Sequence, residues 1–154
     1  MVFSKATGEL AVGDKKGVVH FHKCDDFAET AKFEGHNDQS ITCMAVTADG
    51  KTIASGDKYR YTHVLDAASH EGTSKYAFQP ASVVSVAFSE DGSQLAIVAT
   101  DMSFGVVNLA DGKHKHVKNP HMDKKPQLCA FLPDGKLATA GDDCAIRIWD
   151  VKAE

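Results

Sequence analysis

The 154-residue sequence lacks the segments that carry a chain into a membrane or onto a nucleic acid. No stretch reaches the roughly 18 consecutive apolar residues of a membrane-spanning helix, and Met1 to Val12 has no sustained apolar core of the signal-peptide kind. A basic excess is also missing, since 17 Lys and Arg against 21 Asp and Glu give a formal net charge of −4. Because nucleic-acid binding depends on a basic face, we expect neither nucleic acid nor membrane as a partner.

Cysteine pairing and glycosylation signals are absent too. The four cysteines form no Cys-x-x-Cys pair, and there is no Asn-x-Ser/Thr acceptor. Disulfides and glycans mark secreted proteins, so we expect reduced thiols and a cytoplasmic protein. His20-x-His22 and His114-x-His116 each place two imidazoles on one strand face, but no further ligand is visible at zinc-site spacing. The sequence therefore predicts no metal and no cofactor.

What the sequence does contain is a repeat. Four turn glycines, Gly8, Gly50, Gly92 and Gly135, are spaced by 42, 42 and 43 residues, and three of them follow aspartate. Apolar or alternating runs typical of strands lie before and after each turn, as in residues 83–88 and 95–97. No segment shows a long period of 3.6 residues. The pattern predicts an all-β chain in which each repeat contributes about four short strands.

The last repeat ends in Ile146-Arg147-Ile148-Trp149-Asp150, and it is identified as a WD repeat by its period and its Trp-Asp ending. The fold class implied by this resemblance is a WD40-type β-propeller of four repeats, with blades at about 1–34, 35–74, 75–113 and 114–154. Basic residues at 113–118 and 124–125 fall between the third and fourth repeats and are expected mostly in solvated loop, with 116–117 as a weak outer strand of the third repeat. A local acidic partner is the alternative.

WD repeats commonly hold a blade with a histidine, a Ser or Thr, a turn aspartate and the tryptophan. The fourth repeat supplies His121, Thr139, Asp143 and Trp149, and the second supplies His36, which lies 14 residues before Gly50 as His121 lies before Gly135. The second repeat has Leu65 in place of tryptophan, and we expect no matching turn aspartate there. This set is interpreted as structural. No nucleophile elbow or oxyanion loop accompanies it, so we expect no catalytic residue and no enzyme.

Propellers of this kind usually close with about seven blades. Little chain precedes the first turn, so most of the innermost strand of the first repeat is expected to be missing. We expect the chain to be the C-terminal part of a longer propeller; the alternatives are a ring completed by a copy or a partner, and a closed four-bladed ring. An open first blade would leave unpaired strand edges that invite association.

Several elements resemble the end of the second propeller of the actin-interacting protein 1 family. They are Leu10–Asp14 with Val18–Lys23, Ile41 through Asp57, Phe78–Val83, and Pro120 through Val151. The third repeat departs most, with Val98-Ala99-Thr100-Asp101 and Val107-Asn108. The resemblance implies a partner role with actin and cofilin, promoting filament disassembly without a cofactor, and a cytoskeletal association. The alternative is a WD-repeat scaffold of another complex, of the ciliary, ribosome-assembly or ubiquitin-ligase type.

Partner contacts are expected on loops rather than strands. The loops at one face contain eight candidates: Asn37, Asp38, Lys58, Tyr59, Arg60, Asp123, Lys124 and Asp142. With Tyr61, residues Tyr59 and Arg60 form the cluster most like a binding hot spot, because Tyr and Arg dominate such sites. The alternative is that a tyrosine here packs at the blade edge.

Overall fold

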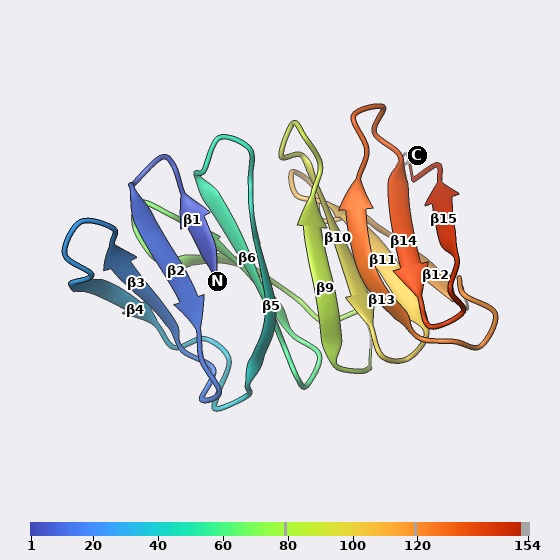
Figure 1. Cartoon of the computed structure of the whole chain (residues 1–154), viewed down its shortest axis with the longest axis horizontal. Coiled ribbons are helices and arrows are strands. Elements are labelled where there is room, and N and C mark those ends of the chain that lie inside the picture. Colours follow the sequence, from blue (N-terminus) through green and yellow to red (C-terminus); the bar gives the residue numbers. More distant parts are fainter. Residues whose placement is uncertain (79, 119, 152–154) are drawn as a thin grey trace.

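In a computed structural model, which describes residues 1–78, 80–118 and 120–151, the chain forms 15 strands in four antiparallel sheets (Figure 1). The predicted all-β class with a repeated sheet is confirmed. The described ranges contain no helix long and apolar enough to cross a membrane.

The sheets follow one another along the chain, and each runs in simple sequence order from the inner strand to the outer one. The first sheet contains β1 (Val2–Ser4), β2 (Glu9–Gly13), β3 (Val19–Lys23) and β4 (Glu29–Phe33). The second contains β5 (Ile41–Val46), β6 (Thr52–Asp57), β7 (Thr62–Asp66) and β8 (Gly72–Tyr76). The third contains β9 (Val83–Phe88), β10 (Gln94–Ala99), β11 (Ser103–Asn108) and β12 (His114–Lys118). The fourth contains β13 (Pro126–Phe131), β14 (Leu137–Gly141) and β15 (Ile146–Trp149).

The four sheets stand side by side, with β1, β5, β9 and β13 contacting in sequence as their innermost strands (Figure 1). The turn after each inner strand uses a glycine in the left-handed region, with φ between 71° and 80°. In each of the last three turns an aspartate oxygen accepts the backbone N–H two residues on, at 3.0–3.1 Å, as Asp49 does from Lys51. Glycine tolerates this backbone because it has no Cβ, which is why the glycine spacing predicted the turns.

Three apolar clusters fill the spaces between neighbouring sheets. Each draws on two sheets, and the strand alternation decides which side chain enters which cluster. On β10, Leu95 and Ile97 pack toward the second sheet, whereas Ala96 and Val98 pack toward the fourth. Ile53 and Leu65 of the second sheet join Phe21 in the cluster shared with the first sheet. The sheets are therefore held face to face by buried apolar surface.

Two strands extend the sequence-based expectation. The first repeat has only a short inner strand, β1, as expected from the little chain before its turn, and Ser4 donates its hydroxyl to the carbonyl of Gly50 at 2.6 Å. The outer strand expected at residues 116–117 is longer, because residues 114–118 form β12, which pairs with β11. The expected boundary between residues 113 and 114 thus falls in front of the outer strand of the third sheet. The strand forms because β11 offers an unpaired edge that a basic, exposed strand can cover.

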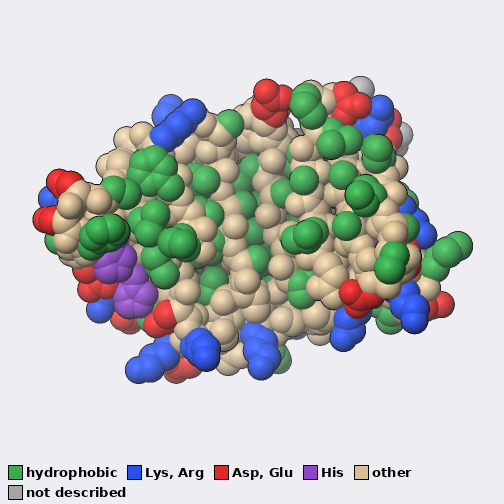
Figure 2. All heavy atoms as spheres, viewed as in Figure 1, with side chains coloured by type: hydrophobic (Ala, Val, Ile, Leu, Met, Phe, Trp, Pro, Cys, Tyr) green, Lys and Arg blue, Asp and Glu red, His purple; other side chains and the backbone are tan. Residues whose placement is uncertain are grey.

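The outer face of the fourth sheet is apolar and uncovered. Leu128 and Ile146 both lie beside Ala140 in the strand register, and Ile148 lies beside Ala138, so they share one face. Their exposed fractions are 63%, 76% and 61%. Hydrophobic side chains are visible on the surface at this end of the molecule (Figure 2). A contiguous apolar face of this kind marks a place where another element packs.

Candidate functional site

Four polar side chains form a chain of hydrogen bonds across the fourth sheet. Nδ1 of His121 lies 2.8 Å from Oδ1 of Asp143, and Nε2 lies 2.9 Å from Oγ1 of Thr139. The indole N–H of Trp149 donates to that same hydroxyl oxygen at 2.9 Å. With a proton on Nδ1, His121 donates to Asp143, and Thr139 can donate its hydroxyl hydrogen to Nε2 while accepting from Trp149. The structure brings together the four residues that the repeat pattern nominated, and the connected network rigidifies the sheet.

Arg147 is a fifth member that the sequence pattern did not nominate. Its guanidinium forms an ion pair with Oδ2 of Asp143. Desolvation raises the pKa of the Asp143 carboxyl, but hydrogen bonds from Arg147 and His121 outweigh it and lower the pKa to about 2. Asp143 is therefore an anion at neutral pH. Only the geometry of the intervening turn decides that a side chain four residues later reaches it.

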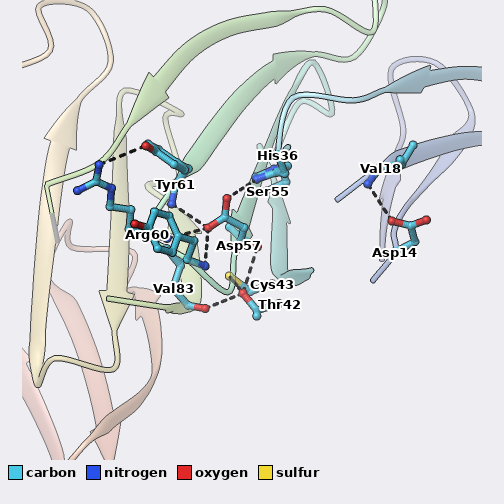
Figure 3. Close-up of polar contacts among 12 residues, drawn as sticks. Asp14, Val18, His36, Thr42, Cys43, Ser55, Asp57, Arg60, Tyr61 and Val83 are labelled. Carbon is cyan, nitrogen blue, oxygen red and sulfur yellow. Dashed lines mark hydrogen bonds and ion pairs between the residues drawn. The ribbon is translucent and has the colours of Figure 1, made fainter. Parts of the chain in front are cut away.

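The second sheet holds an equivalent network built on a different aspartate. Nδ1 of His36 lies 2.9 Å from Oδ2 of Asp57, and Nε2 lies 2.8 Å from Oγ of Ser55, with all three side chains buried (Figure 3). The expectation of no matching aspartate in this repeat is wrong. Asp57 ends β6, four residues after Ile53, whereas Asp143 lies six residues after Leu137, so an alignment by position missed it.

Asp57 also shapes the loop that follows it. Its Oδ1 accepts the backbone N–H groups of Tyr59, Arg60 and Tyr61 at 2.8–2.9 Å (Figure 3). The carboxylate that accepts these three partly buried bonds is itself fully buried, and a charged acceptor makes stronger hydrogen bonds than a neutral one. One buried side chain therefore connects the interior network to the backbone of a surface loop.

The side chains of this loop form a cationic and aromatic cluster. The Arg60 guanidinium lies 5.2 Å from the ring centroid of Tyr61 and 5.5 Å from that of Tyr59, and it donates to the Tyr61 hydroxyl at 3.2 Å. Lys75, from the neighbouring outer strand β8, places Nζ 3.8 Å from the centre of the Tyr61 ring. Tyr59 is 56% exposed, and Tyr61 is half-buried. We call Tyr59, Arg60, Tyr61 and Lys75 the Tyr59 patch. The strand pairing brings in Lys75, which the sequence did not nominate.

The other candidates from the sequence fall into two groups. Asn37 and Asp38 are exposed on the β4–β5 connection, and Lys58 is tied to that connection because its N–H donates to the carbonyl of Ser40 at 2.8 Å. This group therefore lies on the second sheet, as the Tyr59 patch does. Asp123, Lys124 and Asp142 are exposed on the fourth sheet, where Asp142 accepts a hydrogen bond from the side chain of Gln127 at 2.9 Å.

A second buried histidine lies beside the network of the second sheet. The ring centroids of His63 and His36 are 4.5 Å apart. Burial, with the nearby charges of His36 and Lys75, lowers the pKa of His63 to about 4, and burial also lowers the pKa of His36. Both rings are neutral at physiological pH. His36 keeps the structural hydrogen-bonding role expected for it, and His63 packs against its ring.

Across the described ranges, one group of side chains has the spacing of metal ligands: His20, His22 and Glu29, on β3 and β4 of the first sheet. The expectation that no third ligand accompanies the histidine pair does not hold for this arrangement, because the strand pairing adds the carboxylate. The group is separate from both hydrogen-bond networks.

Comparison with known proteins adds the following. Residues 27–65 and 115–150 match the WD40 family model, described as WD domain, G-beta repeat. The 66 kDa stress protein of Physarum polycephalum is 28% identical over 148 residues, which are 94% of this chain and 24% of that protein. WD repeat-containing protein 1 of Xenopus tropicalis is 28% identical over 152 residues, which are 96% of this chain and 25% of that protein. This chain thus spans about a quarter of the length of these relatives. The solved structure of U3-55K is similar in fold, with a TM-score of 0.87 at 22% identity over 97% of this chain and 47% of that one.

Proposed function

We propose that this chain, which carries WD40 repeats, is part of a larger β-propeller that binds other proteins and catalyses no reaction. The observation that carries the proposal is the Tyr59 patch. It presents exposed aromatic and cationic side chains on a loop whose backbone is held from below by the buried Asp57. A preorganised surface of this kind binds with little loss of conformational entropy.

The chemistry of the Tyr59 patch suits an acidic protein surface. Arg60 and Lys75 are cations, and the rings of Tyr59 and Tyr61 provide apolar area beside them. Tyr and Arg are the residues most enriched among those whose truncation weakens protein complexes. Lys58, which is exposed next to the patch, extends its positive charge. Asn37 and Asp38, on the connection between β4 and β5, are also exposed.

The partner that we propose is the actin filament decorated with cofilin, and the role is to promote its disassembly. Support comes from the elements of residues 10–23, 41–57, 78–83 and 120–151, which resemble those of the actin-interacting protein 1 family. Binding would favour a deformed filament by having a higher affinity for that state than for the undeformed one. In this proposal the protein is cytoplasmic and associated with the cytoskeleton.

The uncovered apolar face of the fourth sheet supports a larger propeller. The exposed side chains of Leu128, Ile146 and Ile148 are apolar, like the side chains buried between the neighbouring sheets of this chain. Relatives about four times as long have room for further blades. We therefore favour additional sheets of the same polypeptide over a ring closed from these four sheets alone.

Co-sedimentation with actin filaments tests the proposed function. The complete polypeptide that contains this chain is mixed with filaments, with and without cofilin, and filament loss is followed in parallel by microscopy. We expect binding that depends on cofilin, and we expect Arg60→Glu to weaken it by about tenfold or more. Lys113→Glu is the matched control, because it makes the same charge change at an exposed lysine of the third sheet.

Two results would contradict the proposal in different ways. If the complete polypeptide leaves cofilin-decorated filaments unbound, the actin assignment is wrong, and a scaffold of another complex becomes the better hypothesis. If binding occurs but is weakened equally by Arg60→Glu and Lys113→Glu, the Tyr59 patch is not the contact surface.

A further inference from the structure

Two histidines lie on one face of β3. His20 and His22 are two residues apart, so their side chains leave the strand on the same side. Their rings stack, with centroids 6.3 Å apart and planes inclined by 21°. Both are partly exposed, and histidine side chains are visible at the surface of the end of the molecule that β3 and β4 form (Figure 2). Such a pair supplies two metal-binding nitrogens within reach of each other.

A β-bulge brings a carboxylate to the same place. The register between β3 and β4 shifts after Phe21, so that His22 pairs with Glu29. Thr30 is the extra residue, and it turns to the other face, where its hydroxyl donates to a carboxylate oxygen of Glu9 at 2.6 Å. In a regular ladder Thr30 would lie opposite His22, and Glu29 would point away from it. Bulges re-aim side chains in this manner.

We propose that His20, His22 and Glu29 bind one divalent transition-metal ion of the zinc class. One donor atom from each residue lies within 4.8 Å of the other two, and Nδ1 of His20 lies 2.6 Å from Oε1 of Glu29. Ligand atoms around tetrahedral zinc are about 3.3 Å apart, given bonds of about 2.0–2.1 Å. Small side-chain rotations therefore suffice. Two imidazoles and a carboxylate are ligands that zinc accepts, with water in the remaining position.

The second nitrogen of each imidazole already has an acceptor. Nε2 of His20 lies 3.3 Å from Oδ2 of Asp14, and Nδ1 of His22 lies 3.1 Å from the carbonyl oxygen of Phe27. Asp14 is itself held, because its Oδ1 accepts the N–H groups of Lys16 and Val18 at 2.9 and 2.8 Å. Metal-bound histidines commonly donate their other N–H to a carboxylate or a carbonyl. These contacts leave Nδ1 of His20 and Nε2 of His22 for the metal.

The bound ion would cross-link two neighbouring strands. It would join β3 to the outer strand β4, which covers the edge of the first sheet. Lys32 competes for the same carboxylate, since its Nζ lies 3.2 Å from Oε2 of Glu29. In the proposed site the metal ligand is the other carboxylate oxygen, Oε1, which faces His20.

The experiment is a titration of the full chain with Zn²⁺ by calorimetry, repeated with Co²⁺, whose visible absorption reports the ligand set. We expect one ion per chain and a thermal unfolding midpoint that rises with Zn²⁺. His22→Gln and Glu29→Gln are each expected to weaken binding by tenfold or more. Unfolding curves recorded without metal check that both variants fold. Because binding is read from the metal, this result is independent of any actin assay.

Two controls separate this site from other ligands. The double variant His114→Gln/His116→Gln removes the second His-x-His pair of the chain, on β12, and should leave Zn²⁺ affinity unchanged. Cys24→Ser removes an exposed thiol on the connection between β3 and β4 and should also leave it unchanged. Folded variants at His22 and Glu29 with wild-type affinity, loss of binding in either control, or no binding by the wild-type chain would each overturn the proposal.

Discussion

Oδ2 of Asp57 lies 2.9 Å from Nδ1 of His36, in the buried interior of the second sheet. The other oxygen of this carboxylate accepts three backbone N–H groups of the loop after β6. The interior network and the surface loop therefore share one side chain. A change at Asp57 is expected to affect both the stability of the sheet and the shape of the Tyr59 patch.

Replacing Asp57 with alanine should destabilise the chain by about 3 kcal/mol or more. The change leaves three backbone donors and the His36 ring without their acceptor in a buried place, and such orphaned groups are costly. Asp57→Asn should cost less, because an amide oxygen can still accept from the loop. Urea denaturation measures both. Asp49 also accepts a backbone N–H, but it lies in an exposed turn, so Asp49→Ala should lower the free energy of unfolding by less. Equal effects at the two positions would contradict the assigned role.

Trp149→Ala should lower the free energy of unfolding by about 3 kcal/mol. The indole packs 5.3 Å from the Phe104 ring, centroid to centroid, and its N–H donates to Thr139. Trp149→Phe keeps most of the packing and loses the hydrogen bond, so it should cost about 1 kcal/mol. The two variants are compared by their denaturant midpoints, provided that their free energies of unfolding depend on denaturant with the same slope. An unchanged midpoint for the alanine variant would mean that Trp149 contributes no packing.

The chain should lose stability as the pH falls from about 6.5 to 4. Burial, His36 and Lys75 lower the pKa of His63 to about 4 in the folded chain, with Asp57 opposing them. An unfolded histidine has a pKa of about 6.5, so the unfolded state takes up the proton first. Neutral His63 therefore contributes its full share to the free energy of unfolding above about pH 6.5. This share is lost as the pH falls, and the loss reaches about 3 kcal/mol at about pH 4.

His63→Gln provides the comparison for this pH dependence. Glutamine does not titrate, so the variant should lose less stability than the wild type over the same interval. Chemical denaturation at several pH values gives the two slopes. Parallel slopes would show that His63 is not the group responsible. The low pKa of Asp143, about 2, keeps that carboxylate ionised throughout the interval.

The isolated chain should self-associate through the fourth sheet. Leu128, Ile146 and Ile148 present an apolar face that nothing in the described ranges covers. The double variant Ile146→Glu/Ile148→Glu should shift sedimentation toward the monomer, because charges on this face oppose its burial. Met122→Glu, at an exposed apolar residue in a connection, should leave the association unchanged. A wild-type chain that stays monomeric at high concentration would contradict the prediction.

Sequence reasoning was most successful where the signal is local. The turn glycines and the strand alternation predicted the sheets, because φ preference and the direction of successive side chains depend on near neighbours alone. It failed at Asp57, because the carboxylate beside the equivalent histidine can come from either of two places. In the second sheet it comes from the end of a strand, and in the fourth sheet it comes from the turn after the strand. It also predicted only residues 116–117 of β12, because a basic strand is stabilised by its neighbour rather than by its own composition.

The sequence by itself determined the all-β class, the four repeats, the turn positions and the polar set around His121. These follow from periodicity and from residue types at fixed spacing. Only the tertiary structure decided that Lys75 lies on the Tyr61 ring, that Arg147 reaches Asp143 and that Glu29 rather than Thr30 faces His22. Each depends on strand register or on the path of a turn, and a shift of one residue reverses the side to which a side chain points.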